Sequence, residues 1–283
     1  MKAFQSNELK EAVLRHYASL LERFTVPYEE LMLKTRYGDT YVLAAGDKEK
    51  PPVILLHGSS MNAAMWISDM NAMSDRYRVY APDMPGEPGK SDEEQWPFDT
   101  PDYAEWLLDV LDGLSIQSAV IAGASLGAWL ATKFAIIHPE RASKLVLLCP
   151  AGIGSQNHAF KDIALSLLAK GEEGVTELFT VINGGAPVQE AVMNYQKLIA
   201  AAFRSRQEPI PSFTDEELKR LTMPCIVFVG EKDIMLRSDE TAARVSALMP
   251  QAEVVVLPDR GHSLSGLGDE IMAFLDRQTI QNA

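Results

Sequence analysis

The sequence predicts an α/β fold: a mainly parallel, doubly wound sheet that carries a helical cap insertion. Three observations lead to this class. Short apolar runs alternate with helical stretches, a Gly-x-Ser-x-Gly turn directly follows one of those runs, and one long segment is helical without a strand. Strands that are apolar throughout are buried on both faces, as in a parallel sheet covered by helices on each side.

Length and composition fit one large domain with an insertion. The chain has 283 residues, of which 47% are hydrophobic and 23% charged, and this excludes a largely disordered chain. The formal net charge of −13 argues against nucleic acid as a partner, because phosphate contacts need lysine and arginine. No signal peptide or membrane span is evident, so we expect a cytoplasmic protein without a membrane partner. Cys149 and Cys225 lie in apolar runs and are expected to be buried, reduced thiols.

The first part of the chain is expected to be a helix and an antiparallel strand pair. Apolar residues at helical spacing predict a helix over Asn7–Phe24, within an N-terminal segment 1–25 that packs on the core. Tyr28–Lys34 and Asp39–Ala45 follow as the strand pair. Six further strands are predicted at Val53–Leu56, Tyr77–Ala81, Ser118–Ala122, Leu145–Cys149, Cys225–Val229 and Glu253–Leu257.

The strand rhythm stops between the fourth and fifth of those six strands. Residues 152–222 are expected to form a helical cap over the carboxyl edge of the sheet, between core segments 26–151 and 223–283. Its predicted helices are Phe160–Lys170, Gly174–Ile182, Val188–Phe203 and Thr214–Leu221.

The most informative short motif is Gly123-Ala124-Ser125-Leu126-Gly127. A serine on a sharp turn from strand to helix presents its hydroxyl above the sheet edge, and the flanking glycines allow strand and helix to approach closely. Ser125 is therefore the candidate nucleophile. The amide of Leu126 then lies in the first turn of the helix, where it can stabilise an oxyanion.

A serine hydroxyl needs a base to activate it and an anion to orient that base. His262 follows Gly261 in a turn after the last predicted strand, and it is the candidate base. His16 and His158 are expected at the surface, and His138, near a helix end, is expected to be structural.

The acid is expected after the strand Cys225–Val229. Asp233 is favoured because it lies at the far side of the turn, and Glu231 is the competing carboxylate. Asp83 precedes the serine in the chain, so it is a weaker candidate for which a structural role in its turn is expected.

The remaining site residues come from the loop after Val53–Leu56 and from nearby large side chains. The amide of Ser59 is the expected second oxyanion donor, with His57 ordering the loop. Trp66 and Met84 are candidate substrate-binding residues, although core packing is the competing role for both.

Together these motifs resemble the α/β-hydrolase superfamily over Leu31–Leu275. The motifs are His57-Gly58, the serine turn, His138-Pro-Glu-Arg141, Gly230-Glu-Lys-Asp233 and Gly261-His262. Within that superfamily the N-terminal helix and Asp102–Val110 resemble bacterial esterases of the carboxylesterase NP type. The resemblance implies Ser125 as nucleophile, His262 as base, Asp233 as acid, and the Ser59 and Leu126 amides as oxyanion hole.

The expected activity is hydrolysis of small or medium, largely apolar carboxylic esters through an acyl-enzyme, with no metal or organic cofactor. Two alternatives remain open at this point. One is a hydrolase of carbon–carbon bonds in ring-cleavage products, which would use the same residues. The other is a non-catalytic ligand-binding protein on the same fold.

Overall fold

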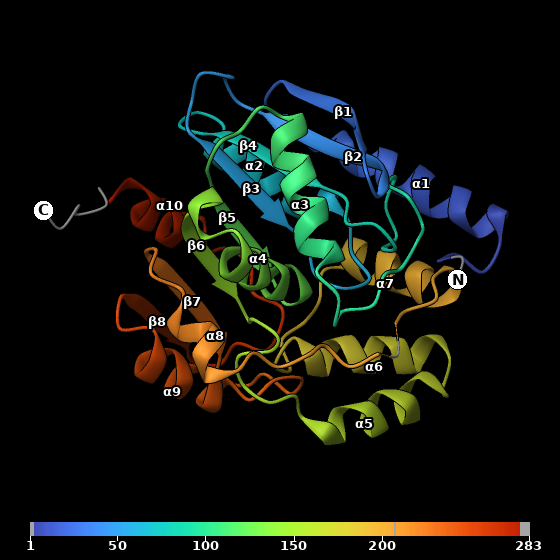
Figure 1. Ribbon diagram of the computed structural model, residues 1–283. Coiled ribbons are helices and arrows are strands. Elements are labelled where there is room, and N and C mark those ends of the chain that lie inside the picture. Colours follow the sequence, from blue (N-terminus) through green and yellow to red (C-terminus); the bar gives the residue numbers. More distant parts are fainter. Residues whose placement is uncertain (1–2, 207, 278–283) are drawn as a thin grey trace, which may run out of the picture.

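The computed structural model describes residues 3–206 and 208–277, and within them one sheet of eight strands forms the centre of the molecule (Figure 1). The strand order is β1-β2-β4-β3-β5-β6-β7-β8. β1 and β4 both pair antiparallel with β2, and all pairs from β4 onward are parallel. The predicted fold class is confirmed. The strands are β1 Tyr28–Thr35, β2 Gly38–Ala45, β3 Pro52–Leu56, β4 Arg78–Pro82, β5 Ala119–Ala124, β6 Ala142–Leu148, β7 Cys225–Gly230 and β8 Ala252–Leu257.

Each predicted strand is present, with ends within three residues of the prediction. The predicted helices are also found, with ends that differ from the prediction by up to three residues. The helices are α1 Asn7–Leu21, α2 Ile67–Met73, α3 Asp102–Gly113, α4 Leu126–Ile137, α5 His158–Leu168, α6 Glu172–Ile182, α7 Glu190–Ala202, α8 Asp215–Lys219, α9 Ser238–Leu248 and α10 Gly268–Asp276, with 3-10 turns η1 Ala63–Trp66 and η2 Pro139–Arg141. Among the described helices, none is both long and apolar enough to cross a membrane.

Helices cover both faces of the sheet and enclose two hydrophobic cores. One core lies beneath α3, α4 and α9, and the other lies beneath α1, α2 and α10. Residues of β3 alternate between them: Ile54 and Leu56 enter the first core, whereas Val53 and Leu55 enter the second. This division explains why the central strands are apolar at every position.

Between β6 and β7 the chain leaves the sheet and forms α5, α6 and α7, which lie together at one end of the molecule (Figure 1). The following helix α8 differs from the expected cap. Phe213, Leu218 and Leu221 lie in the first core, and α8 contacts α9, so this segment packs on the main body.

The N-terminal segment contacts the end of α7. The rings of Phe4 and Phe203 pack edge to face with centroids 6.0 Å apart, and the amide of Gln5 donates to the carbonyl of Ala202 at 2.9 Å. Helix α1 contacts α7 in the same region. The first helix thus fixes α7 against the main body.

Candidate active site

Ser125 lies on the sharp turn between β5 and α4, with φ 53° and ψ −109°. This backbone conformation is strained for a residue with a side chain. The glycines on either side of Ser125 allow the turn to form, because neither position has room for a side chain. A Cβ at Gly123 would lie 2.4 Å from the backbone of Gly127, and a Cβ at Gly127 would lie 2.2 Å from the carbonyl oxygen of Leu56. The helix therefore approaches the sheet as closely as the backbones allow.

His262 reaches Ser125 from the turn after β8. Its Nε2 lies 2.9 Å from Ser125 Oγ, and its Nδ1 lies 2.7 Å from Asp233 Oδ2. The backbone amide of His262 donates to the carbonyl of Ile182, at the end of α6, at 2.8 Å. The three side chains come from the ends of β5, β7 and β8, so they meet at the carboxyl edge of the sheet.

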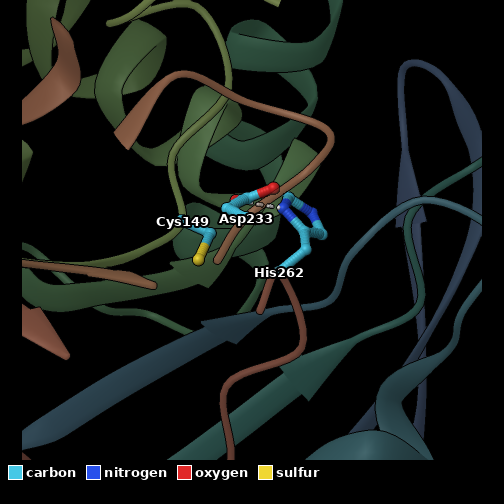
Figure 2. A group of neighbouring side chains, drawn as sticks. All are labelled: Cys149, Asp233 and His262. Atoms are coloured by element: carbon cyan, nitrogen blue, oxygen red, sulfur yellow. Dashed lines mark hydrogen bonds and ion pairs between the residues drawn. The ribbon is translucent and has the colours of Figure 1, made fainter. Parts of the chain in front are cut away.

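The Asp233 carboxylate lies beside the imidazole of His262, and Figure 2 shows the contact between them. Its Oδ1 accepts hydrogen bonds from the amides of Met235 at 2.8 Å and Leu236 at 3.0 Å. Burial of this carboxyl opposes ionisation, but the charge and hydrogen bond of His262, with those amides, outweigh burial and lower the pKa of Asp233. The competing Glu231 is exposed. A carboxylate that is ionised beside Nδ1 favours the tautomer in which Nε2 is free to accept the serine proton.

Cys149 adds a contact that the sequence did not predict. The possible ligand atoms of Cys149, Asp233 and His262 lie within 4.8 Å of one another, so the Cys149 thiol lies beside the Asp233 carboxylate (Figure 2). The side chain is buried, and burial raises the pKa of the thiol well above its usual range. The nearby Asp233 carboxylate acts in the same direction, because a negative charge disfavours ionisation of the thiol.

Ser59 and Leu126 lie on the two loops expected to stabilise an oxyanion. Leu126 begins α4, so its amide is among the first four of the helix, which have no partner within it. In residues 3–206 and 208–277, the amide of Ser59 donates no hydrogen bond. The two loops are close, because a Cβ at Gly58 would lie 3.8 Å from Cβ of Ser125.

His57 orders this loop from within the core. Its Nε2 accepts a hydrogen bond from the amide of Met84 at 2.9 Å, and its Nδ1 lies 2.9 Å from the carbonyl oxygen of Gly58. Burial lowers the pKa of His57 to about 4, so the ring is neutral near pH 7. Since Nε2 accepts, Nδ1 carries the proton and donates to Gly58.

Several other candidates have structural surroundings. The Asp83 carboxylate is buried and accepts hydrogen bonds from the Tyr17 hydroxyl and the amides of Ala63 and Lys90, in keeping with a role in its turn. His138 lies 2.9 Å from a Glu105 carboxylate oxygen, at the end of α4.

The structure also places the two histidines expected at the surface and the two candidate substrate-binding residues. His158 is exposed, but the prediction for His16 was wrong: its ring is partly buried and stacks on Tyr195 with centroids 5.4 Å apart. Trp66 is 3% exposed in the second core, and Met84 is 1% exposed in the first. Their surroundings support the core-packing role, because large apolar side chains fill both cores.

The profile of the Alpha/beta hydrolase family matches residues 53–273. The chain belongs to this family. The carboxylesterase YbfK of Bacillus subtilis is 30% identical over 268 residues, which cover 90% of each chain. The crystal structure of naproxen esterase (carboxylesterase NP) from Bacillus subtilis superposes with a TM-score of 0.87 at 28% identity, over 96% of this chain and 100% of that one.

A further hydrolase shares the fold at lower identity. The 2-hydroxy-6-oxo-6-phenylhexa-2,4-dienoate hydrolase of Rhodococcus sp. strain RHA1 superposes with a TM-score of 0.72 at 21% identity, over 89% of this chain and 100% of that chain. A likeness at this identity shows the fold alone, because one fold serves many reactions.

Proposed function

We propose that this α/β hydrolase is a serine carboxylesterase in which Ser125 is the nucleophile, His262 the base and Asp233 the acid. The observation that carries the proposal is the continuous chain of hydrogen bonds from Ser125 Oγ through both imidazole nitrogens to Asp233, at 2.9 and 2.7 Å. The similarity over nearly the whole chain to two Bacillus carboxylesterases supports an ester as the substrate.

The reaction proceeds in two acyl-transfer steps. The Ser125 hydroxyl gives its proton to His262 Nε2 while its oxygen attacks the ester carbonyl, whose electron pair moves onto the carbonyl oxygen. The amides of Ser59 and Leu126 stabilise this oxyanion. As the carbonyl re-forms, the carbon–oxygen bond breaks and the alcohol leaves with the proton from His262. A water molecule then releases the acid in the same way and returns the proton to Ser125.

The proposed substrates are small or medium, largely apolar esters, and the proposed location is the cytoplasm. Both cysteines are buried free thiols, which is consistent with a reducing compartment. The net charge of −13 disfavours strongly anionic substrates. Residues of α5 and α6 form a small apolar cluster with Ile234 and Met235, next to the acid, and this cluster supports an apolar environment beside the site.

The test compares wild type with Ser125→Ala on a chain-length series of p-nitrophenyl esters and on a dienoic keto acid. We expect wild type to hydrolyse the esters and Ser125→Ala to be inactive, while the circular-dichroism spectrum of the variant matches that of wild type. Turnover of the keto acid with little activity on esters would favour carbon–carbon hydrolysis instead. No turnover of either substrate class by wild type would favour a binding protein.

A further inference from the structure

The buried glutamate of the loop after β4 has no part in the reaction described above. We propose that Glu87 is a positioning residue that holds the oxyanion loop, His57–Ser60, in its catalytic conformation by accepting a hydrogen bond from the amide of Ser60. This inference rests on the proposed function, because it assigns Glu87 to the loop that carries the Ser59 donor.

The Glu87 carboxylate is almost completely enclosed and points at the loop. The residue is 3% exposed, and Glu87 Oε2 lies 2.6 Å from the amide nitrogen of Ser60. This bond fixes the Ser59–Ser60 peptide, which directly follows the proposed Ser59 donor. Positioned donors of this kind stabilise an oxyanion because they need no rearrangement during the reaction.

Ser60 needs such a restraint. Its φ of 61° lies in the left-handed region, which is unfavourable for a residue with a side chain. A change of this φ to the extended region would reorient the Ser59–Ser60 peptide and, through it, Ser59. The bond from Ser60 to the fixed carboxylate opposes the rotation.

The loop after β4 is itself rigid. The Asp83 carboxylate accepts the amide of Lys90 at 2.7 Å, and its backbone carbonyl accepts the Ser91 hydroxyl at 2.7 Å. The amide of Gly89 donates to the carbonyl of Glu87 at 2.8 Å. Glu87 therefore projects from a braced turn, as a positioning residue must.

Further hydrogen bonds connect the same two loops. Met84 donates its amide to His57 at 2.9 Å, and the side-chain amide of Asn62 donates to the carbonyl of Pro88 at 3.0 Å. These contacts flank Ser59 and Ser60 on either side. Glu87 supplies the contact between them, and it does so with a carboxylate, which makes a stronger hydrogen bond than a neutral group.

Keeping this carboxylate buried is costly, and the charge of Arg206 offsets only part of the cost. Burial raises the pKa of Glu87 to about 7, whereas the Ser60 amide and the charge of Arg206 lower it. Arg206 is itself engaged with the Trp96 carbonyl at 2.6 Å and with the Tyr103 hydroxyl. A role limited to charge pairing with Arg206 is the alternative that an experiment must separate from positioning.

Two conservative substitutions separate reach from charge. Glu87→Asp keeps the charge but shortens the side chain by one methylene, so the carboxylate loses the 2.6 Å contact with Ser60. Glu87→Gln keeps the reach and an oxygen acceptor but loses the charge. Glu94→Gln, at an exposed glutamate of the same segment, is the matched control.

The assay measures kcat and KM on p-nitrophenyl butyrate and the inhibition constant of a trifluoromethyl ketone, whose hemiketal oxygen mimics the oxyanion. Loss of one oxyanion donor costs about 100- to 1000-fold in kcat, so partial misplacement in Glu87→Asp should cost about tenfold. We expect KM to change less than threefold and the inhibition constant to rise in parallel with the loss of kcat. Glu87→Gln should retain kcat within about threefold.

Two results would overturn the positioning role. A greater loss of kcat in Glu87→Gln than in Glu87→Asp would indicate charge pairing. Values of kcat in both variants equal to that of Glu94→Gln would show that Glu87 has no role in turnover. Stoichiometric labelling by a fluorophosphonate, read at its end point, reports whether Ser125 still reacts. If wild type were not labelled, the proposed function would fail; if labelling were complete and kcat unaffected in both variants, only the role of Glu87 would fail.

Discussion

Replacing Asp233 by asparagine should impair the enzyme through the tautomer of His262. The Oδ1 atom of Asp233 accepts two backbone amides, those of Met235 at 2.8 Å and Leu236 at 3.0 Å. An asparagine must keep its oxygen at that position, because its NH2 group would leave both amides without an acceptor. Its NH2 group therefore takes the Oδ2 position, 2.7 Å from His262 Nδ1.

The consequence is a histidine protonated on the wrong nitrogen. Nδ1 must accept the hydrogen bond from asparagine, so the proton moves to Nε2, which then cannot take the proton of Ser125. The same substitution in a well-studied serine protease lowers kcat by about 10⁴, and we expect a loss of about 10³ to 10⁴ here.

The assay is kcat for p-nitrophenyl butyrate at pH 7.5, with Glu231→Gln as the control at the exposed carboxylate of the same turn. The concentration of folded enzyme is checked by circular dichroism. A loss of less than tenfold in Asp233→Asn, or an equal loss in Glu231→Gln, would refute this reasoning about the acid.

Three other results are expected. Gly127→Ala should lower the free energy of unfolding by about 3 kcal/mol, because its Cβ would lie 2.2 Å from a backbone oxygen; Gly268→Ala, with no atom within 4 Å, should be near neutral in the same denaturant titration. Because the pKa of Glu87 is raised to about 7, its contribution to stability is present below about pH 4.5 and is lost as the pH rises to 7. Between these pH values the free energy of unfolding of wild type should fall by about 3 kcal/mol more than that of Glu87→Gln. Parallel plots of unfolding free energy against pH for the two proteins would contradict the assignment. Neither Cys149 nor Cys225 should react with iodoacetamide before unfolding, since both are buried. Rapid modification of either thiol in the folded protein, detected by mass spectrometry, would contradict this expectation.

The sequence predicts those parts of the site that depend on local geometry. Ser125 is recognisable because its turn requires glycines on both sides, and His262 because it follows a strand end with a glycine before it. The carboxyl ends of parallel strands lie at the same edge of the sheet, so the proximity of Ser125 and His262 is predictable without knowing the loop conformations.

Contacts between loops are not predictable in the same way. The bond from Ser60 to Glu87, the approach of Cys149 to Asp233 and the bond from His262 to Ile182 join segments whose relative positions depend on packing across the whole molecule. The packing of α8 on the main body has the same origin. Its apolar residues have helical spacing like those of α5 to α7, and their burial in the first core, where α8 contacts α9, depends on tertiary packing.

The central claim is that Ser125 forms the acyl-enzyme, and covalent labelling tests it most directly. Wild-type protein is treated with a fluorophosphonate, digested, and the modified residue is located by mass spectrometry. We predict one adduct per chain, on Ser125, that appears together with the loss of esterase activity and is absent from Ser125→Ala. An adduct on another residue, or inhibition without modification of Ser125, would contradict the account.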